Sequence, residues 1–143
     1  MDRLVPFVHV ADVEASLAFY ALLGFRAQDV MRDSSGRVIW ALTQSGGTGR
    51  GEGAEIMFAR ADGPVDPAQQ AVLFYMYSTD VAGLRAGLLA GGLDDGGVYC
   101  GQAGPNGGRR VVFEVATPHY MPRGEVRVAD PDGYCVLVGQ VQH

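Results

Sequence analysis

A strand-helix pattern occurs twice in this chain of 143 residues, and this repetition constrains the fold more than any other feature. Asp12 and Asp80 each precede a helix-like stretch, where an aspartate carboxylate can accept hydrogen bonds from the free N–H groups of the first turn. Gly24 and Gly92 follow these stretches at the same offset, and glycine ends helices readily because it adopts left-handed backbone angles. The sequence therefore predicts two related modules.

Each predicted helix lies between strand-like runs rich in β-branched and aromatic residues. A strand is expected before each helix, at 5–10 and at 72–77. The later strands are expected at 26–31, 37–43, 54–59, 98–102, 111–115, 125–129 and 134–138. The apolar stripes of the helices are expected to consist of Val13, Leu17 and Tyr20 in the first, and Val81, Leu84 and Leu88 in the second.

Charge and apolar content argue against several classes of protein. Eleven lysine and arginine residues against sixteen acidic ones give a net charge of -5, which disfavours a nucleic-acid partner or an anionic membrane surface. No stretch approaches the roughly 20 apolar residues that cross a bilayer, and the N-terminus lacks the features of a signal peptide. We therefore expect a cytoplasmic protein in which Cys100 and Cys135 are reduced thiols.

Two signatures at opposite ends of the chain resemble those of one superfamily. Residues 5–20, VPFVHVADVEASLAFY, are followed by Leu-Gly-Phe at 23–25, and Asp-Pro-Asp-Gly at 130–133 precedes the last strand-like run. The chain resembles the vicinal-oxygen-chelate superfamily, which includes glyoxalase I, bleomycin-resistance proteins and extradiol dioxygenases. Because the repeat joins the two signatures, the resemblance spans nearly the whole chain.

The resemblance implies an α+β fold made of two βαβββ modules, whose mixed curved sheets form a cleft and whose helices lie on the outside. We expect one such domain over residues 1–143, with the first module at 1–60, a linker at 61–70 and the second module at 71–143. In many members of this superfamily a second chain completes the cleft. The resemblance therefore also implies a homodimer, which would cover sheet edges that are otherwise exposed.

Apolar residues occupy the positions at which enzymes of this superfamily bind metal. The resemblance places these positions at Val5 and Leu73 on the first strand of each module, and at Leu137 and about Met57 on the last strands. Valine and leucine cannot coordinate a divalent cation, and the thioether of methionine is too soft for the metals these enzymes use. We therefore expect no metal ion and no other cofactor, which places the metal-dependent activities of the superfamily in doubt.

Strand alternation selects the residues that should face the predicted cleft, because every second residue of a strand lies on the same face. Val126 and Val128 should pack beneath a helix, so Glu125 and Arg127 should point the other way. The pattern does not decide on which face of its strand Trp40 lies. The predicted ligand-binding residues are Val5, Phe7, His9, Tyr75, Tyr77, Glu125, Arg127 and Leu137.

His9 and Glu125 are the candidate catalytic groups, and each also has a purely structural interpretation. His9 can contact a ligand or act as a general base, or it can be a hydrogen-bonded histidine at the rim of the cleft. Glu125 and Arg127 can orient a polar ligand among aromatic rings, or they can form an ion pair that only neutralises itself. His119 belongs to a long loop that could cover the mouth of the cleft.

The hypothesis that these observations favour is a metal-free protein that sequesters or senses a small organic compound with a flat or aromatic part. The acidic net charge, together with Glu125, favours a cationic ligand slightly. Two alternatives stay open. One is a lyase, an isomerase or another enzyme of the same superfamily that uses His9 or Glu125 as general base. The other is a metal enzyme whose ligands have moved to His9, His119 and Glu125.

Overall fold

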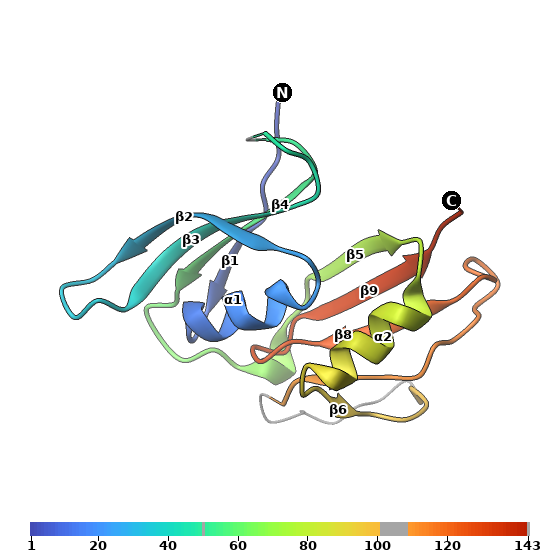
Figure 1. Ribbon diagram of the computed structural model, residues 1–143. Helices are drawn as coiled ribbons and strands as arrows, with labels where there is room; N and C mark the ends of the chain where they lie inside the picture. The colour runs from blue at the N-terminus through green and yellow to red at the C-terminus, as the bar shows by residue number, and fades with distance from the viewer. Residues whose placement is uncertain (50, 101–108, 143) are drawn as a thin grey trace. The chain divides into compact units, whose positions relative to one another are not determined.

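The computed structural model describes residues 1–49, 51–100 and 109–142, and the chain divides into two compact units, Met1–Val65 and Asp66–His143. The first unit contains β1 (Phe7–Val10), α1 (Val13–Ala21), β2 (Arg26–Arg32), β3 (Val38–Ser45) and β4 (Ala54–Arg60) (Figure 1). The second contains a 3-10 turn η1 (Pro67–Gln69), β5 (Leu73–Ser78), α2 (Val81–Ala90), β6 (Asp94–Asp95), β7 (Val111–Val112), β8 (Glu125–Ala129) and β9 (Cys135–Gln140).

The two sheets share one topology. Strand order is β1-β4-β3-β2 in the first and β5-β9-β8-β7-β6 in the second. In both sheets the strand before the helix pairs in parallel with the last strand of the unit, and the next two pairings are antiparallel. The predicted α+β fold of two βαβββ modules is therefore confirmed, with β6 as an addition to the second module.

Both helices begin with the same hydrogen bonds, at the predicted offset. The carboxylate of Asp12 accepts from the backbone N–H of Ala15 at 3.2 Å, and that of Asp80 accepts from Gly83 at 2.8 Å. These bonds satisfy N–H groups that the first turn of a helix leaves without partners. The helices are short, at nine and ten residues, and no helix in the described ranges is long and apolar enough to cross a membrane.

The ends of the two helices also match. Gly24 and Gly92 have φ angles of +90° and +98°, in the left-handed region that favours glycine. The next residue in each module folds back, so that Phe25 N–H donates to the carbonyl of Tyr20 at 3.0 Å and Leu93 N–H to that of Leu88 at 3.1 Å. Phe25 and Leu93 are both buried, which anchors each helix end to the core.

Each helix covers one face of its own sheet. Helix α1 packs on β2, β3 and β4, and α2 packs on β7, β8 and β9 (Figure 1). In α1 the buried residues include Val13, Ser16 and Tyr20, whereas Leu17 of the predicted stripe is only half-buried. The buried line of α1 therefore passes through Ser16 and not through Leu17.

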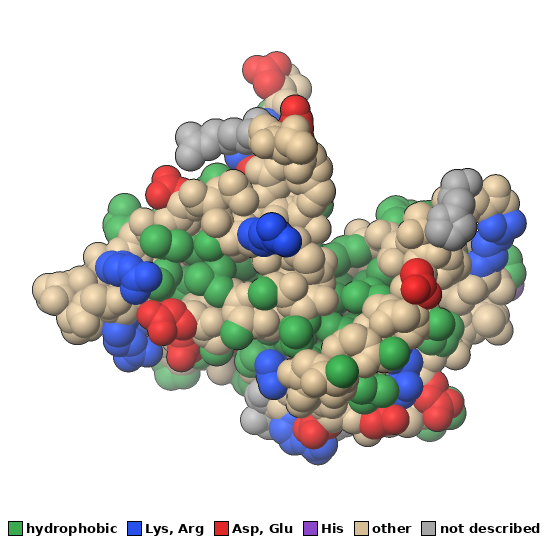
Figure 2. Space-filling model, viewed as in Figure 1, with side chains coloured by type: hydrophobic (Ala, Val, Ile, Leu, Met, Phe, Trp, Pro, Cys, Tyr) green, Lys and Arg blue, Asp and Glu red, His purple; other side chains and the backbone are tan. Residues whose placement is uncertain are grey.

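The residues buried beneath the helices come from alternate positions of the strands. They are Val8, Val10, Ala41, Thr43, Ile56 and Phe58 in the first unit, and Val112, Val126, Val128, Val136 and Val138 in the second. Strand β2, at the edge of the first sheet, has every residue exposed. Apolar side chains reach the surface over this strand (Figure 2), where Val30 and Met31 are 39% and 57% exposed.

The predicted turn at 130–133 orders the last two strands. The buried carboxylate of Asp130 accepts from the backbone N–H groups of Asp132 and Tyr134, both at 2.9 Å. Gly133 completes the turn with a φ of +84°. As a result β8 and β9 pair in a regular antiparallel register in which Arg127 lies opposite Leu137.

In the second unit, the segment between α2 and β8 differs from the prediction. A strand was expected at 98–102, but β6 is Asp94–Asp95, residues 98–100 lie outside any strand, and 101–102 are outside the described ranges. Aspartate is unfavourable in strands, yet ion pairs with Arg109 and Arg85 hold Asp94 and Asp95. The strand expected at 111–115 is only the two residues of β7.

Loss of either helix cap should destabilise the fold. We expect Asp12→Ala and Asp80→Ala each to lower the free energy of unfolding by about 1 kcal/mol, because each leaves a first-turn N–H without its acceptor. Urea denaturation followed by circular dichroism measures this change. The control is Asp62→Ala, which replaces an exposed aspartate with no bond to other described residues. If the cap variants are as stable as the control, the caps do not have this role.

Candidate functional site

The second sheet has one face without a helix, and most of the predicted site residues lie on it. Tyr75 on β5 is opposite Leu137 on β9, which is opposite Arg127 on β8. In the next row Tyr77, Gly139 and Glu125 are aligned in the same way. We call this surface the open face of the second sheet. The predicted orientation of the β8 residues is thereby confirmed, since Val126 and Val128 are fully buried on the opposite face.

Glu125 is the centre of a hydrogen-bond network on this open face. Its side chain is almost entirely buried, with the residue only 7% exposed. One carboxylate oxygen accepts from the hydroxyl of Tyr75 at 2.5 Å, and the other accepts from the hydroxyl of Tyr120 at 3.0 Å. Burial, and then the bond to Glu125, raises the pKa of Tyr75, while the bond to Glu125 raises the pKa of Tyr120. Both hydroxyls therefore remain protonated donors at neutral pH.

Arg127 has different partners from Glu125. Its Nη1 donates to the Sγ of Cys135 at 3.1 Å, and its Cζ lies 4.0 Å from the centroid of the Tyr99 ring. The Tyr99 ring in turn meets Phe113 edge-on, with centroids 5.2 Å apart. Burial raises the pKa of the Cys135 thiol, and the neighbouring Arg127 opposes this. The predicted alternative of a self-neutralising pair between Glu125 and Arg127 does not describe these contacts.

Two tyrosine rings stand exposed beside the network. The rings of Tyr75 and Tyr77 have centroids 5.3 Å apart, and these residues are 40% and 65% exposed. Gly139, which pairs with Tyr77, leaves space for the Tyr75 hydroxyl and for Met121, because a Cβ there would lie 2.7 Å from Met121 Cε and 3.0 Å from the Tyr75 hydroxyl. The segment that carries Tyr120 and Met121 thus closes one end of the open face.

The first sheet has a corresponding open face. Phe7 and His9 lie on it with ring centroids 5.4 Å apart, and both are exposed. The register aligns His9 with Ala59 and Ala59 with Trp40, which assigns the half-buried Trp40 to this face. Val5 precedes β1, because Pro6 has no N–H for the ladder and contributes only its carbonyl, to Met57.

The register also shows an acidic residue that spacing alone missed. Met57 lies opposite Phe7, so continuing the parallel register by two residues brings Glu55 opposite Val5. Glu55 is buried and forms a two-point ion pair with the guanidinium of Arg3. In the second sheet the direct partner of Leu73 is Cys135, whereas Leu137 is opposite Tyr75.

The proposed relocated metal ligands are not gathered by the structure within either unit. His9 belongs to the first unit, whereas His119 and Glu125 belong to the second. His119 is exposed and contacts the ring of Tyr120 edge-on. Within the described ranges, no group of three or more histidine, cysteine or acidic side chains is arranged to hold a metal ion.

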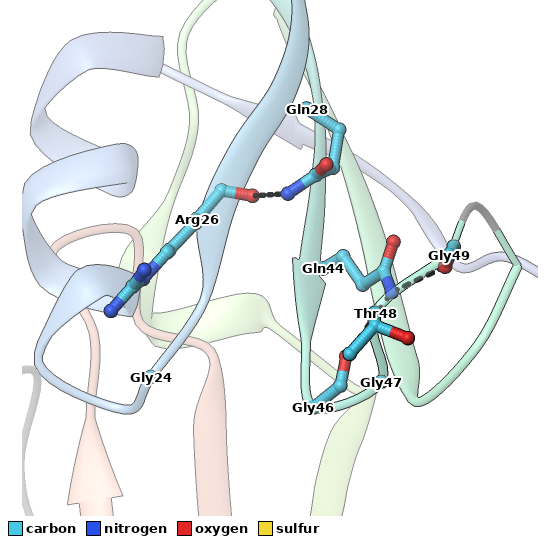
Figure 3. Close-up of a pocket in the computed structure, with 8 residues that line it drawn as sticks. All are labelled: Gly24, Arg26, Gln28, Gln44, Gly46, Gly47, Thr48 and Gly49. Atoms are coloured by element: carbon cyan, nitrogen blue, oxygen red, sulfur yellow. Dashed lines mark hydrogen bonds between the residues drawn. The ribbon is translucent and has the colours of Figure 1, made fainter.

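A polar cavity of about 350 Å³ lies in the first unit, away from the predicted residues. Figure 3 shows its lining, which consists of Gly24, Arg26, Gln28, Gln44, Gly46, Gly47, Thr48 and Gly49. Gln44 donates to the carbonyls of Gly46 and Gly49, and the carboxylate of Glu52 accepts from the N–H groups of Thr48 and Gly49. These bonds hold the glycine-rich loop in shape. No residue spacing in the sequence predicted this cavity.

Comparison with known proteins shows the class of this structure. No protein-family model matches the chain, and no curated protein matches it. Solved structures match over nearly its whole length, at low identity and with TM-scores well above 0.5. The chain has the vicinal-oxygen-chelate fold, which is the fold of bleomycin-binding proteins and glyoxalase-related enzymes. The expected resemblance is thereby confirmed for the fold.

Three of these structures are especially informative. A bleomycin resistance determinant encoded on the transposon Tn5 is 19% identical, covers 100% of both chains and has a TM-score of 0.68. A bleomycin-binding protein from Streptomyces verticillus, solved with copper(II)-bleomycin, is 18% identical over 98% of this chain and 96% of that one, with a TM-score of 0.67. A glyoxalase-related enzyme from Clostridium phytofermentans is 12% identical over 98% and 95%, with a TM-score of 0.68.

The Tyr75 hydroxyl should contribute to stability, and the Tyr77 hydroxyl should not. We expect Tyr75→Phe to lower the free energy of unfolding by about 1–2 kcal/mol, because buried Glu125 loses a donor; partial exposure of Tyr75 limits the loss. Tyr77→Phe is the matched control, since its hydroxyl has no bond to other described residues. Chemical denaturation compares the two variants. Equal stabilities would contradict the network.

Proposed function

We propose that this protein binds a small organic compound with a flat aromatic part, without a metal ion, and sequesters or senses it. The observation that carries the proposal is the pair of exposed rings, Tyr75 and Tyr77, on a face that also holds Glu125 and Arg127. Exposed rings beside a few oriented polar groups are typical of sites for small organic ligands. Stacking between rings contributes roughly 0.5–1.5 kcal/mol per pair beyond area burial.

The similar structures support a binding protein and leave an enzyme as the second candidate. Two of them are a bleomycin resistance determinant and a protein solved with copper(II)-bleomycin, whereas the third is a glyoxalase-related enzyme. In this chain, both oxygens of Glu125 already accept hydrogen bonds from tyrosines. A general base needs a lone pair within reach of the substrate proton, so this arrangement favours binding over catalysis by Glu125.

The absence of a metal ion from the proposed function rests on the side chains present. Val5 and Leu73 are apolar, and Glu55, the carboxylate nearest Val5 in the register, is engaged by Arg3. A cation at this position would have to displace the guanidinium from a buried carboxylate, which is unfavourable. Metal-free binding is therefore part of the proposal.

A neutral flat probe tests the proposed site. We expect 1-pyrenemethanol to bind, as followed by its fluorescence, and Tyr77→Ala to weaken binding by about 5–10-fold because one stacking partner is lost. A chelator such as EDTA should leave the affinity unchanged. The control is Val72→Ala, at a residue that is 57% exposed and precedes β5 out of phase with the open face. Failure of the probe to bind, or equal affinities in wild type and Tyr77→Ala, would reject this site.

We also propose that the protein acts in the cytoplasm as a homodimer. Leu73 and Tyr77, on the open face of the second sheet, are 53% and 65% exposed, and exposed apolar side chains that cluster often mark interaction surfaces. Light scattering at micromolar concentration should give twice the chain mass of 15.2 kDa. A measured mass of one chain would contradict the dimer and leave the ligand site to be tested by itself.

A further inference from the structure

We propose that the ligand carries an oxyanion, such as a carboxylate or a phenolate, and that Arg127 binds it. This inference rests on the proposed function and names the class of compound that the open face of the second sheet would take. The two charged residues on that face differ in their hydrogen-bond partners. Each oxygen of the acidic group, Glu125, accepts from a tyrosine hydroxyl, whereas the basic group, Arg127, donates to a weak acceptor among the described residues.

Arg127 is a half-buried cation for which the described residues supply no anionic partner. A guanidinium has five N–H donors, and the one contact with an acceptor goes to the Cys135 sulfur, which is a weak acceptor. The ring of Tyr99 stacks on the guanidinium and orients its plane, but it accepts none of these N–H groups in the plane. Among the described residues, no carboxylate oxygen lies within ion-pair distance of Arg127.

The acidic residues near Arg127 are engaged elsewhere. Both oxygens of Glu125 accept from Tyr75 and Tyr120, and Asp130 is buried in the turn, where it accepts from two backbone N–H groups. A cationic ligand would have to compete with two tyrosine hydroxyls for a carboxylate that is only 7% exposed. The slight preference for a cationic ligand, which net charge suggested, is therefore reversed by the contacts of these two residues.

The register gives the proposed ligand its shape. Tyr75, Leu137 and Arg127 lie side by side on three adjacent strands. Neighbouring strands are about 4.8 Å apart, so Tyr75 and Arg127 are separated by roughly 10 Å across the sheet. A flat aromatic acid spans this distance with its rings over Leu137 and beside Tyr75, and its carboxylate at the guanidinium, where a two-point hydrogen bond can form.

Three probes that share one ring system separate charge from stacking. They are 1-pyrenecarboxylate, 1-pyrenemethanol and 1-pyrenemethylammonium, each titrated by fluorescence at neutral pH. We expect the anion to bind wild-type protein about 10-fold more tightly than the neutral probe, since a charge-assisted hydrogen bond is worth about that factor. The cation should bind most weakly. Arg127→Gln should remove the advantage of the anion over the neutral probe.

Two further variants control the result. Arg109→Gln removes the same charge from the same unit, at an exposed residue paired with Asp94, and should preserve the wild-type order. Arg127→Lys keeps the charge but loses the planar fork and the stacking on Tyr99, so it should retain only part of the preference for the anion. If Arg127→Gln fails to fold, as judged by circular dichroism, Arg127→Lys decides the question.

The outcomes distinguish this inference from the proposed function. If the neutral and cationic probes bind at least as tightly as the anion, or if Arg127→Gln weakens all three equally, the oxyanion is wrong and the binding function stands. An unchanged preference for the anion in Arg127→Lys would likewise show that charge alone, without the fork, determines selectivity, and would overturn the two-point contact. If no probe binds to wild-type protein, the proposed function fails, and the inference fails with it.

Discussion

One-sided packing of a helix on a sheet is the constraint on which the rest of the structure depends. Helix α2 buries Val126 and Val128, and because successive side chains of a strand point to opposite faces, Glu125 and Arg127 must lie on the face that α2 leaves open. The same rule in the first unit buries Val8 beneath α1. Because each helix covers one face of its sheet, the side chains at alternate strand positions, including the aromatic rings, lie on the opposite face.

Glu125 and Arg127, which carry opposite charges two residues apart on β8, contact different side chains. Glu125 joins Tyr75, which is 50 residues away in the chain, to Tyr120 of the segment before β8. Arg127 contacts Cys135 and Tyr99. Each charge thereby holds an aromatic side chain in place at the border of the open face. Side chains that are already oriented lose less conformational entropy when a ligand binds, which favours affinity.

The fold permits both binding proteins and enzymes, so chemistry has to be decided by individual side chains. Here the register associates Val5 with Glu55 and Leu73 with Cys135, and Glu55 is already paired with Arg3. These residues do not present a set of free carboxylates and imidazoles to a cation. Among its described residues, the open face of the second sheet presents instead the rings of Tyr75 and Tyr77, the side chain of Leu137 and the guanidinium of Arg127.

Short-range patterns in the sequence were sufficient for the modular plan. Asp12 and Asp80 cap helices, Gly24 and Gly92 end them, and Asp130 forms its turn, because each of these depends on residues only a few positions away. Alternation along β8 and β5 likewise assigned side chains to faces. The strand expected at 98–102 is absent from the described residues 98–100, and β6 forms instead at two aspartates that ion pairs with Arg85 and Arg109 help to hold.

By itself, then, the sequence determined the two modules, their helix limits and the residues that share a face. Only the tertiary structure decided which side chains meet: that Trp40 shares a face with His9, that Tyr120 reaches Glu125, and that Arg127 lies against Tyr99. The physical reason is the separation along the chain of the residues that interact. Capping, turns and alternation act between near neighbours in the chain, whereas these contacts depend on strand register and on where loops return to the sheet, which distant residues set together.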